Sequence, residues 1–198
     1  MRKLVVPIVV VLIALFAGNW GCGTYNGLVQ MDESVTATWA QVQNVYQRRA
    51  DLIPNLVATV EGAADFERAT LTDVINARAK ATQITVDESI VNSPEKLQQF
   101  QAAQGELSGA LSRLLVAVER YPDLKANQNF LSLQSQLEGT ENRIAVERRK
   151  FNETAQAFNA RIRVMPTALV ARFGGFTRKA YFEADAGAEK APQVKFGQ

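Results

Sequence analysis

The apolar positions near the start of the chain form a continuous run. From Leu4 to Ala17 the run is interrupted only by Pro7, and Gly18, Asn19 and Trp20 follow it. The 17 residues from Leu4 to Trp20 reach the lower limit for a helix that crosses about 30 Å of hydrocarbon, and a cleaved signal peptide has a similar run. We predict that residues 1–23 are an N-terminal membrane anchor or signal segment.

A heptad stripe follows this run and predicts a long amphipathic helix. Its positions recur in alternating steps of three and four: Tyr25, Leu28, Asp32, Val35, Trp39, Val42, Tyr46, Arg49, Ile53, Leu56 and Val60. Pro54 lies inside the stripe, where it removes one backbone hydrogen bond, so we expect a kink after which the helix resumes. The two charged positions, Asp32 and Arg49, either reach water at a wet edge of the stripe or form polar pairs that fix the register.

The same periodicity predicts three more helices. These are a second helix over 66–80, a third from an N-cap at Ser93 to near Arg120, and a fourth from an N-cap at Asn127 to Pro166. No alternating strand pattern or glycine-rich phosphate loop competes with them. The pattern predicts an all-α fold, an elongated antiparallel four-helix bundle over residues 24–182 behind one N-terminal membrane segment. Residues 183–198 are small, polar and aperiodic, which predicts a disordered tail.

Composition narrows the classes of function. The 198 residues are enough for one domain, and 47% of them are apolar, so a core can form. The chain has no His and a single Cys, which removes zinc sites built on His, Ser-His-Asp or Cys-His catalysis and disulfide frameworks. From residue 22 onward, 20 basic and 20 acidic groups cancel. We therefore expect no cofactor and no nucleic-acid partner.

The N-terminal charges predict an orientation. Arg2 and Lys3 precede the apolar run, and no charge follows until Asp32, so the N-terminus is expected to stay in the cytoplasm. The protein would then cross the membrane once, and its bundle would be exported. A cytoplasm-facing bundle is the alternative. Cys22 offers a further possibility, lipidation, because it follows an apolar run and a small Gly21, although Asn19 and Trp20 depart from a lipoprotein signal.

One segment of the chain resembles a known family. The run Gln47–Val57, QRRADLIPNLV, looks like the signature of the LemA family of bacterial membrane-anchored helical proteins. The likeness extends to about residue 183 through further residues in matching order: Tyr25, Asn26, Leu28, Trp39, Tyr121–Asn127, Phe130, Thr140–Ile144, Asn152, Asn159, Pro166, Phe176, Tyr181 and Phe182. The resemblance implies an antiparallel four-helix bundle behind one membrane segment. No catalytic activity is established for the family, so it implies no active site.

The densest polar cluster beside the expected kink contains Arg48, Arg49 and Asp51. It could form a notch that binds a partner. Alternatively, Arg49 in the seam would pair with a carboxylate of a facing helix and set the register, with candidates Glu106, Glu119 and Glu141. A third hypothesis makes Asp51 and Glu141 the paired carboxylates of a hydrolase, which requires a deep polar pocket and acids with strongly shifted pKa values.

Charge is unevenly distributed along the chain. Residues 22–142 carry 9 basic and 15 acidic groups, whereas residues 143–179 carry 9 basic and 2 acidic groups. In an alternating bundle the fourth helix returns toward the membrane, so the basic and aromatic segment after it would lie near lipid. We predict a membrane-surface contact through Arg172, Phe173, Phe176, Arg178 and Lys179. The alternative is that this segment wraps back and packs Phe173 and Phe176 on the bundle.

Together these patterns predict a non-enzymatic, membrane-anchored scaffold or adaptor of the bacterial envelope. Its expected partners are membrane lipid at the N-terminus and either further copies of itself or other envelope proteins. Self-association is expected because the first and fourth helices are longer than the other two, which would leave apolar surface to cover.

Overall fold

The described part of the computed structural model, residues 2–62, 66–84 and 89–183, is helical and contains no strand. Its elements are α1 (Arg2–Glu61), α2 (Arg68–Gln83), the 3₁₀ turn η1 (Ile90–Asn92), α3 (Pro94–Val118), α4 (Pro122–Lys125), α5 (Gln128–Arg161) and α6 (Thr167–Phe173). The all-α prediction is confirmed. The predicted tail lies outside the described residues, except for Glu183.

The helix boundaries follow local signals in the sequence. Ser93 caps α3 and accepts a hydrogen bond from the backbone N–H of Lys96, and Asn127 caps α5 through the N–H groups of Asn129 and Phe130. Both predicted caps are confirmed. The predicted end of the fourth helix at Pro166 is wrong, because α5 already ends at Arg161 and a short separate helix, α6, follows the proline.

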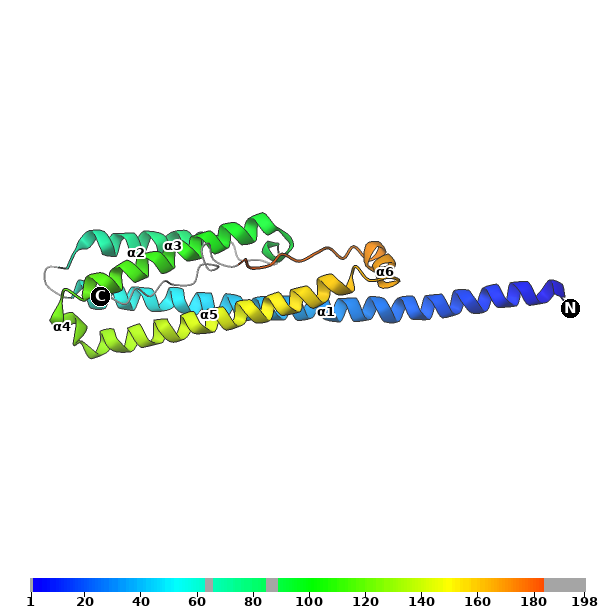
Figure 1. Cartoon of the computed structure of the whole chain (residues 1–198), viewed down its shortest axis with the longest axis horizontal. Helices are drawn as coiled ribbons and strands as arrows, with labels where there is room; N and C mark the ends of the chain where they lie inside the picture. The colour runs from blue at the N-terminus through cyan, green and yellow to red at the C-terminus, as the bar shows by residue number, and fades with distance from the viewer. Residues whose placement is uncertain (1, 63–65, 85–88, 184–198) are drawn as a thin grey trace, which may run out of the picture.

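The four long helices lie side by side and alternate in direction (Figure 1). α1 packs along α5, and α2 packs along α3. α1 is one helix of 60 residues, and its N-terminal part extends alone beyond the other helices (Figure 1). We call the remaining part of the molecule, residues 24–183, the helical body. It holds two apolar clusters, one at each end.

The distal cluster lies at the end far from the N-terminus and the proximal cluster at the end where α1 emerges. The distal cluster is built on residues such as Ile53, Leu56, Val74, Leu114 and Phe130. The proximal cluster is built on bulkier side chains: Trp39, Tyr46, Phe100, Phe151, Phe158 and Phe182. Trp39 contacts the rings of Phe100, Phe151 and Phe182 at centroid distances of 5.9, 5.5 and 6.0 Å.

The chain after α6 completes the proximal cluster. Residues 176–183, here called the C-terminal strap, run back along the helical body without forming a helix. Phe182 and Ala180 are buried and belong to the proximal cluster, and Phe176 packs against it. The strap therefore covers apolar surface of α1 and α5 that the sequence analysis expected a second copy to cover.

Candidate functional site

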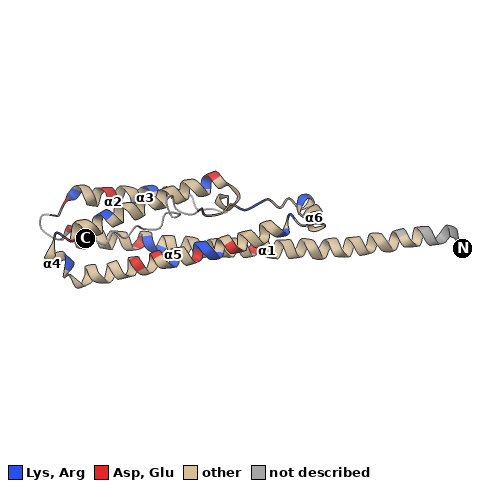
Figure 2. Ribbon diagram, in the orientation of Figure 1, with Lys and Arg blue, Asp and Glu red and all other residues tan. Residues whose placement is uncertain are grey.

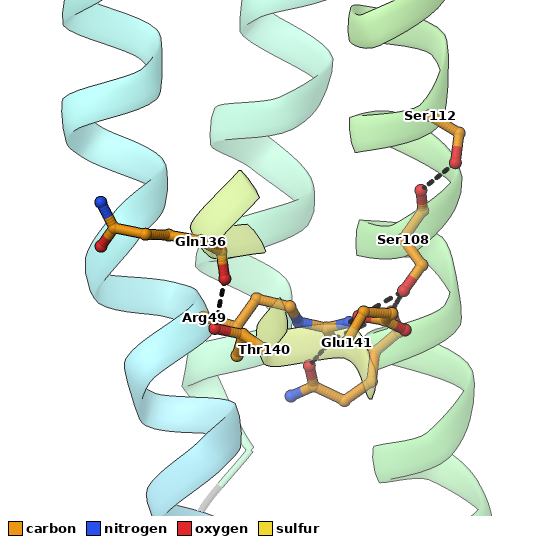
Figure 3. Close-up of polar contacts among 7 residues, drawn as sticks. Arg49, Ser108, Ser112, Gln136, Thr140 and Glu141 are labelled. Carbon is orange, nitrogen blue, oxygen red and sulfur yellow. Dashed lines mark hydrogen bonds and ion pairs between the residues drawn. The ribbon is translucent and has the colours of Figure 1, made fainter. Parts of the chain in front are cut away.

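A buried polar layer crosses the middle of the helical body, and Arg49 is its centre (Figure 3). The side chain of Arg49 is 2% exposed. Its guanidinium donates to Glu141 Oε2 at 2.8 Å and to Ser108 Oγ at 2.9 Å, and also to the side-chain oxygen of Gln104. It lies 5.2 Å from the centre of the Tyr46 ring, within cation–π range. We call Arg49, Gln104, Ser108 and Glu141 the polar layer.

The polar layer separates the two apolar clusters. On α1 the proximal cluster ends at Tyr46 and the distal cluster begins at Leu52. A guanidinium in this position requires several partners, because burying a charge without compensation is costly. Those partners come from α3 and α5, so the layer joins three helices at one level. The ion pair that the sequence analysis considered for Arg49 forms with Glu141, which is itself 53% exposed.

The other predicted members of this cluster lie elsewhere. Arg48 and Asp51 are exposed on α1. Asp51 accepts a hydrogen bond from Gln47 Nε2 at 2.7 Å, one turn before it on the same helix. The structure therefore brings Arg49 and Glu141 together and leaves Arg48 and Asp51 outside the polar layer.

An open groove lies beside the polar layer. Its volume is about 550 Å³, and Tyr46 and Arg49 of α1 form part of its lining. The remaining lining comes from α3, α5 and the end of the strap, and includes Gln98, Gln101, Gly105, Glu141, Arg148 and Glu183. Of the three residues of the predicted partner notch, this groove is lined by Arg49 alone. Among its lining groups Arg49 pairs with Glu141, and the side chains of Gln101 and Arg148 donate to the backbone carbonyl of Glu183.

A second polar contact joins α1 to α2 beside the polar layer, and Pro54 is its cause. A proline has no N–H, so the carbonyl of Ala50 loses its donor within the helix. Arg78 of α2 supplies a replacement, because its Nε donates to Ala50 O at 2.8 Å. α1 continues through Pro54, as predicted. The sequence analysis did not find Arg78, since only the packing of α2 against α1 identifies the donor.

Two asparagines of α5 hold the C-terminal strap. Asn159 donates to Lys179 O at 2.9 Å and accepts from Lys179 N at 2.8 Å. Asn152 makes the same pair of bonds with Phe182, both at 2.9 Å. Each asparagine side chain thus makes the two backbone hydrogen bonds that a neighbouring β-strand would otherwise make with the strap. The resemblance drew attention to both asparagines, but helical periodicity gave them no role.

The strap places the predicted membrane-surface residues in two different environments. The Lys179 side chain is 8% exposed, and its Nζ contacts Asp32 at 2.6 Å and Asn92 at 3.0 Å. Phe176 contacts the rings of Tyr25 and Phe158. Lys179 and Phe176 therefore pack on the helical body, and the lipid contact of this segment stays a prediction.

The other three predicted residues, Arg172, Phe173 and Arg178, are exposed. The alternative prediction, that the segment wraps back onto the bundle, is accordingly right for Phe176 and wrong for Phe173. Cys22, the predicted lipidation site, is also exposed and lies on α1 just after the apolar run.

Comparison of the sequence with known protein families identifies the family of this chain. A family model described as the LemA family matches residues 38–196, which include the polar layer and the strap. The chain belongs to the LemA family. The match begins inside α1 and leaves the apolar N-terminal part of that helix outside it.

Relatives of this LemA-family chain include magnetosome proteins. Magnetosome protein MamQ of Magnetospirillum gryphiswaldense is 28% identical over 174 residues, and MamQ 2 of Paramagnetospirillum magneticum is 26% identical over 175 residues. Each match covers 80% of this chain and 64% of the relative, so the chain spans less than two thirds of their length. Protein LemA of Metamycoplasma hominis is 27% identical over 163 residues, which are 82% of this chain and 70% of the relative.

Among the acidic groups of this LemA-family chain, Glu95 has a perturbed pKa. The pKa of Glu95 lies below its usual value of 4.5, because its own backbone N–H and then the Ser93 hydroxyl donate hydrogen bonds to the carboxylate. Glu95 is fully exposed. Among the described residues, no three His, Cys, Asp or Glu side chains gather where they could hold a metal ion. The two carboxylates of the hydrolase hypothesis have separate partners, Gln47 for Asp51 and Arg49 for Glu141.

Proposed function

We propose that this LemA-family protein is a membrane-anchored, non-enzymatic scaffold or adaptor of the bacterial envelope. One observation carries the proposal: α1 is a single helix that joins an exposed apolar segment to the core of the helical body. In the most apolar 18-residue window of α1, none of the window is buried inside the protein. A helix of that length and composition is suited to the hydrocarbon of a membrane. The rest of α1 supplies side chains to both apolar clusters.

The charge pattern favours one orientation in the inner membrane. In Figure 2 the coloured part of α1 that extends beyond the helical body contains no Lys, Arg, Asp or Glu, and in the sequence no charge occurs between Lys3 and Asp32. Arg2 and Lys3 at the start would keep the N-terminus in the cytoplasm by the positive-inside tendency. The helical body would then lie in the periplasm as a four-helix bundle. Lipidation of Cys22 would give an alternative anchor on the same side.

A scaffold role is favoured because the polar groups of the helical body hold its parts together. The polar layer holds three helices together, and the asparagine pairs hold the strap. Such contacts favour a rigid body rather than a reaction centre, since catalysis generally needs a group whose pKa is tuned by burial or by a neighbouring charge. The surface around the groove is the part of this body that we expect partners to meet.

Anchoring and orientation are tested on the full chain in its membrane. We expect the protein to remain in the membrane fraction after carbonate extraction. For orientation, Val116→Cys places a thiol at a 71% exposed position of α3 in a Cys22→Ser background. A membrane-impermeant maleimide should label this thiol in cells whose outer membrane is opened. Labelling only after lysis would establish the cytoplasm-facing alternative, and release by carbonate would overturn the anchor.

The scaffold role is tested by cross-linking in intact membranes followed by mass spectrometry. Cross-links to other envelope proteins, or between copies of this chain, are the expected result, with the N-terminal segment deleted as a control for the need for anchoring. Recovery of the protein without any cross-linked protein would contradict the proposal.

A further inference from the structure

An exposed apolar surface surrounds α6, on the side of the helical body from which α1 emerges (Figure 1). Phe173 is 90% exposed, which is the largest exposure recorded for a large hydrophobic side chain in the described part of the chain. Three more large apolar side chains of the same segment are exposed: Val164, Met165 and Leu169. We call these four residues the α6 patch.

Two residues of the α6 patch, Leu169 and Phe173, lie on α6, a helix that already has one face packed, and Val164 and Met165 precede that helix. Thr167 and Ala171 are buried, and Val170 packs against the proximal cluster. Leu169 and Phe173 lie one turn apart on the opposite side, where nothing in the described protein covers them. Packing of the helical body therefore accounts for one face of α6 and leaves the α6 patch without a partner.

The position of α6 along α1 places the α6 patch beside the anchor. The backbone that follows α6 abuts Tyr25 of α1: a Cβ added at Gly174 would lie 3.0 Å from the Tyr25 ring. Trp20 follows the apolar run at the expected edge of the hydrocarbon, and Tyr25 is five residues beyond it, which corresponds to about 7.5 Å of helix. The headgroup layer on one side of a bilayer is about 5–8 Å thick. With Trp20 at the edge of the hydrocarbon, the C-terminal end of α6 would lie at the level of the lipid headgroups.

The charges around the α6 patch suit an anionic lipid surface. Residues 154–182 contain no Asp or Glu and five basic residues. Of these, Lys179 is buried against Asp32, whereas four are exposed: Arg161, Arg163, Arg172 and Arg178. The ribbon of Figure 2 is blue for a basic residue at α6 and has no acidic residue on that helix. Exposed apolar side chains bordered by arginines are typical of segments that lie in the membrane interface.

We propose that the α6 patch inserts into the membrane leaflet from which α1 emerges toward the helical body. The neighbouring arginines would pair there with phosphates of anionic lipids. This inference rests on the proposed anchoring by α1. It gives the helical body two contacts with the membrane, so the body is held at a fixed tilt rather than free to swing about one helix. A lipid surface, rather than a second copy of the chain, is favoured by the depth of α6 and by the excess of arginine.

The test uses the full chain in vesicles of phosphatidylcholine with phosphatidylglycerol and in vesicles of phosphatidylcholine alone. In a Cys22→Ser background, Phe173→Cys is labelled with an environment-sensitive fluorophore. Val116→Cys, at the distal end of α3, is the matched control with an exposed label. Flotation of the vesicles reports anchoring separately for each variant.

At position 173 we expect a blue shift of emission, loss of quenching by iodide, and quenching by lipids that carry a spin label. The label at position 116 should behave as in solution. Flotation with a water-exposed label at 173 in both vesicle types overturns this inference and leaves the anchor intact. Shielding from iodide without quenching by the labelled lipids also overturns it, because it indicates a protein contact. Failure to float overturns the proposed function itself.

Discussion

At the level of single residues, Arg49 is a cation buried in the helical body, and such burial is costly unless the charge is paired. Its side chain has lost nearly all contact with water, and the hydrogen bonds that the guanidinium donates to three residues on two other helices compensate for that loss. Glu141 differs from Arg49, because its half-exposed carboxylate can be rehydrated when the pair is broken. The pair is therefore asymmetric: Arg49 depends on Glu141 more than Glu141 depends on Arg49.

This asymmetry gives a stability prediction. Glu141→Gln removes the charge that faces Arg49, so we expect the free energy of unfolding to fall by about 1–3 kcal/mol, the usual cost of leaving a buried polar group poorly paired. The double variant Arg49→Met with Glu141→Gln should recover part of this loss, because an apolar side chain of similar length suits a site between two apolar clusters. Urea unfolding of the detergent-solubilised chain, followed by circular dichroism, measures both.

Glu138→Gln is the matched control, since Glu138 is exposed on the same helix and bonds only locally to Gln134 among the contacts described. It should change stability by less than about 0.5 kcal/mol. A double variant that is less stable than Glu141→Gln alone would contradict the argument that the cost arises from an unpaired buried guanidinium.

At the level of elements, the strap shows how a segment without regular structure becomes part of the core. Its backbone groups bond to side-chain amides of α5, and its Ala180 N–H donates to Val91 O of η1 at 2.8 Å. Glu183 closes the strap, because its carbonyl accepts from Gln101 of α3 and Arg148 of α5. The strap thus ties α3, α5 and η1 together at the proximal end.

We predict that Asn152→Ala and Asn159→Ala loosen the strap selectively. Each substitution leaves one N–H and one carbonyl of the strap unpaired, at a cost of about 1–3 kcal/mol. Hydrogen exchange of the amides in residues 177–183 should accelerate, whereas amides of the distal parts of α2 and α3 should be unchanged. Asn142→Ala, at an exposed position of α5, is the control and should leave exchange of the strap as it is.

Uniform acceleration across the helical body would show that the strap and the distal cluster unfold as one unit. That result would contradict the selective role of the two asparagines.

Much of this element structure could be predicted from the sequence, and the strap marks the limit. The stripe, the caps at Ser93 and Asn127 and the Arg49 pair follow from periodicity, capping chemistry and the cost of a buried charge. Lys179 could not be placed in the same way, because its partner Asp32 is 147 positions away and no periodic pattern relates them. Arg78 was missed for the same reason. The sequence predicts that Pro54 leaves the carbonyl of Ala50 without a donor in its own helix, but it does not predict which side chain of another helix supplies one.

At the level of the whole molecule, glycines occur where the anchor joins the helical body. Gly18, Gly21, Gly23 and Gly27 all lie within α1, and a Cβ added at any of them would meet nothing within 4 Å. Glycine weakens a helix interior relative to alanine because it loses more backbone freedom on folding. The junction is therefore a locally weak stretch of an otherwise continuous helix, and the packing of α6 against Tyr25 supports it from one side.

Alanine substitutions at two kinds of glycine should therefore change the stability of the junction in opposite directions. Gly23→Ala with Gly27→Ala should stabilise α1 at the junction by about 1–2 kcal/mol in total, since no neighbour obstructs either methyl group. Gly174→Ala should destabilise the contact between α6 and α1, because its Cβ would lie 2.8 Å from the Phe176 ring and 3.0 Å from the Tyr25 ring. Hydrogen exchange in lipid vesicles should slow at residues 23–31 in the first variant and quicken at residues 170–176 in the second. Equal behaviour of the two variants would mean that α6 does not support the junction, and the helical body would then be free to tilt about its anchor.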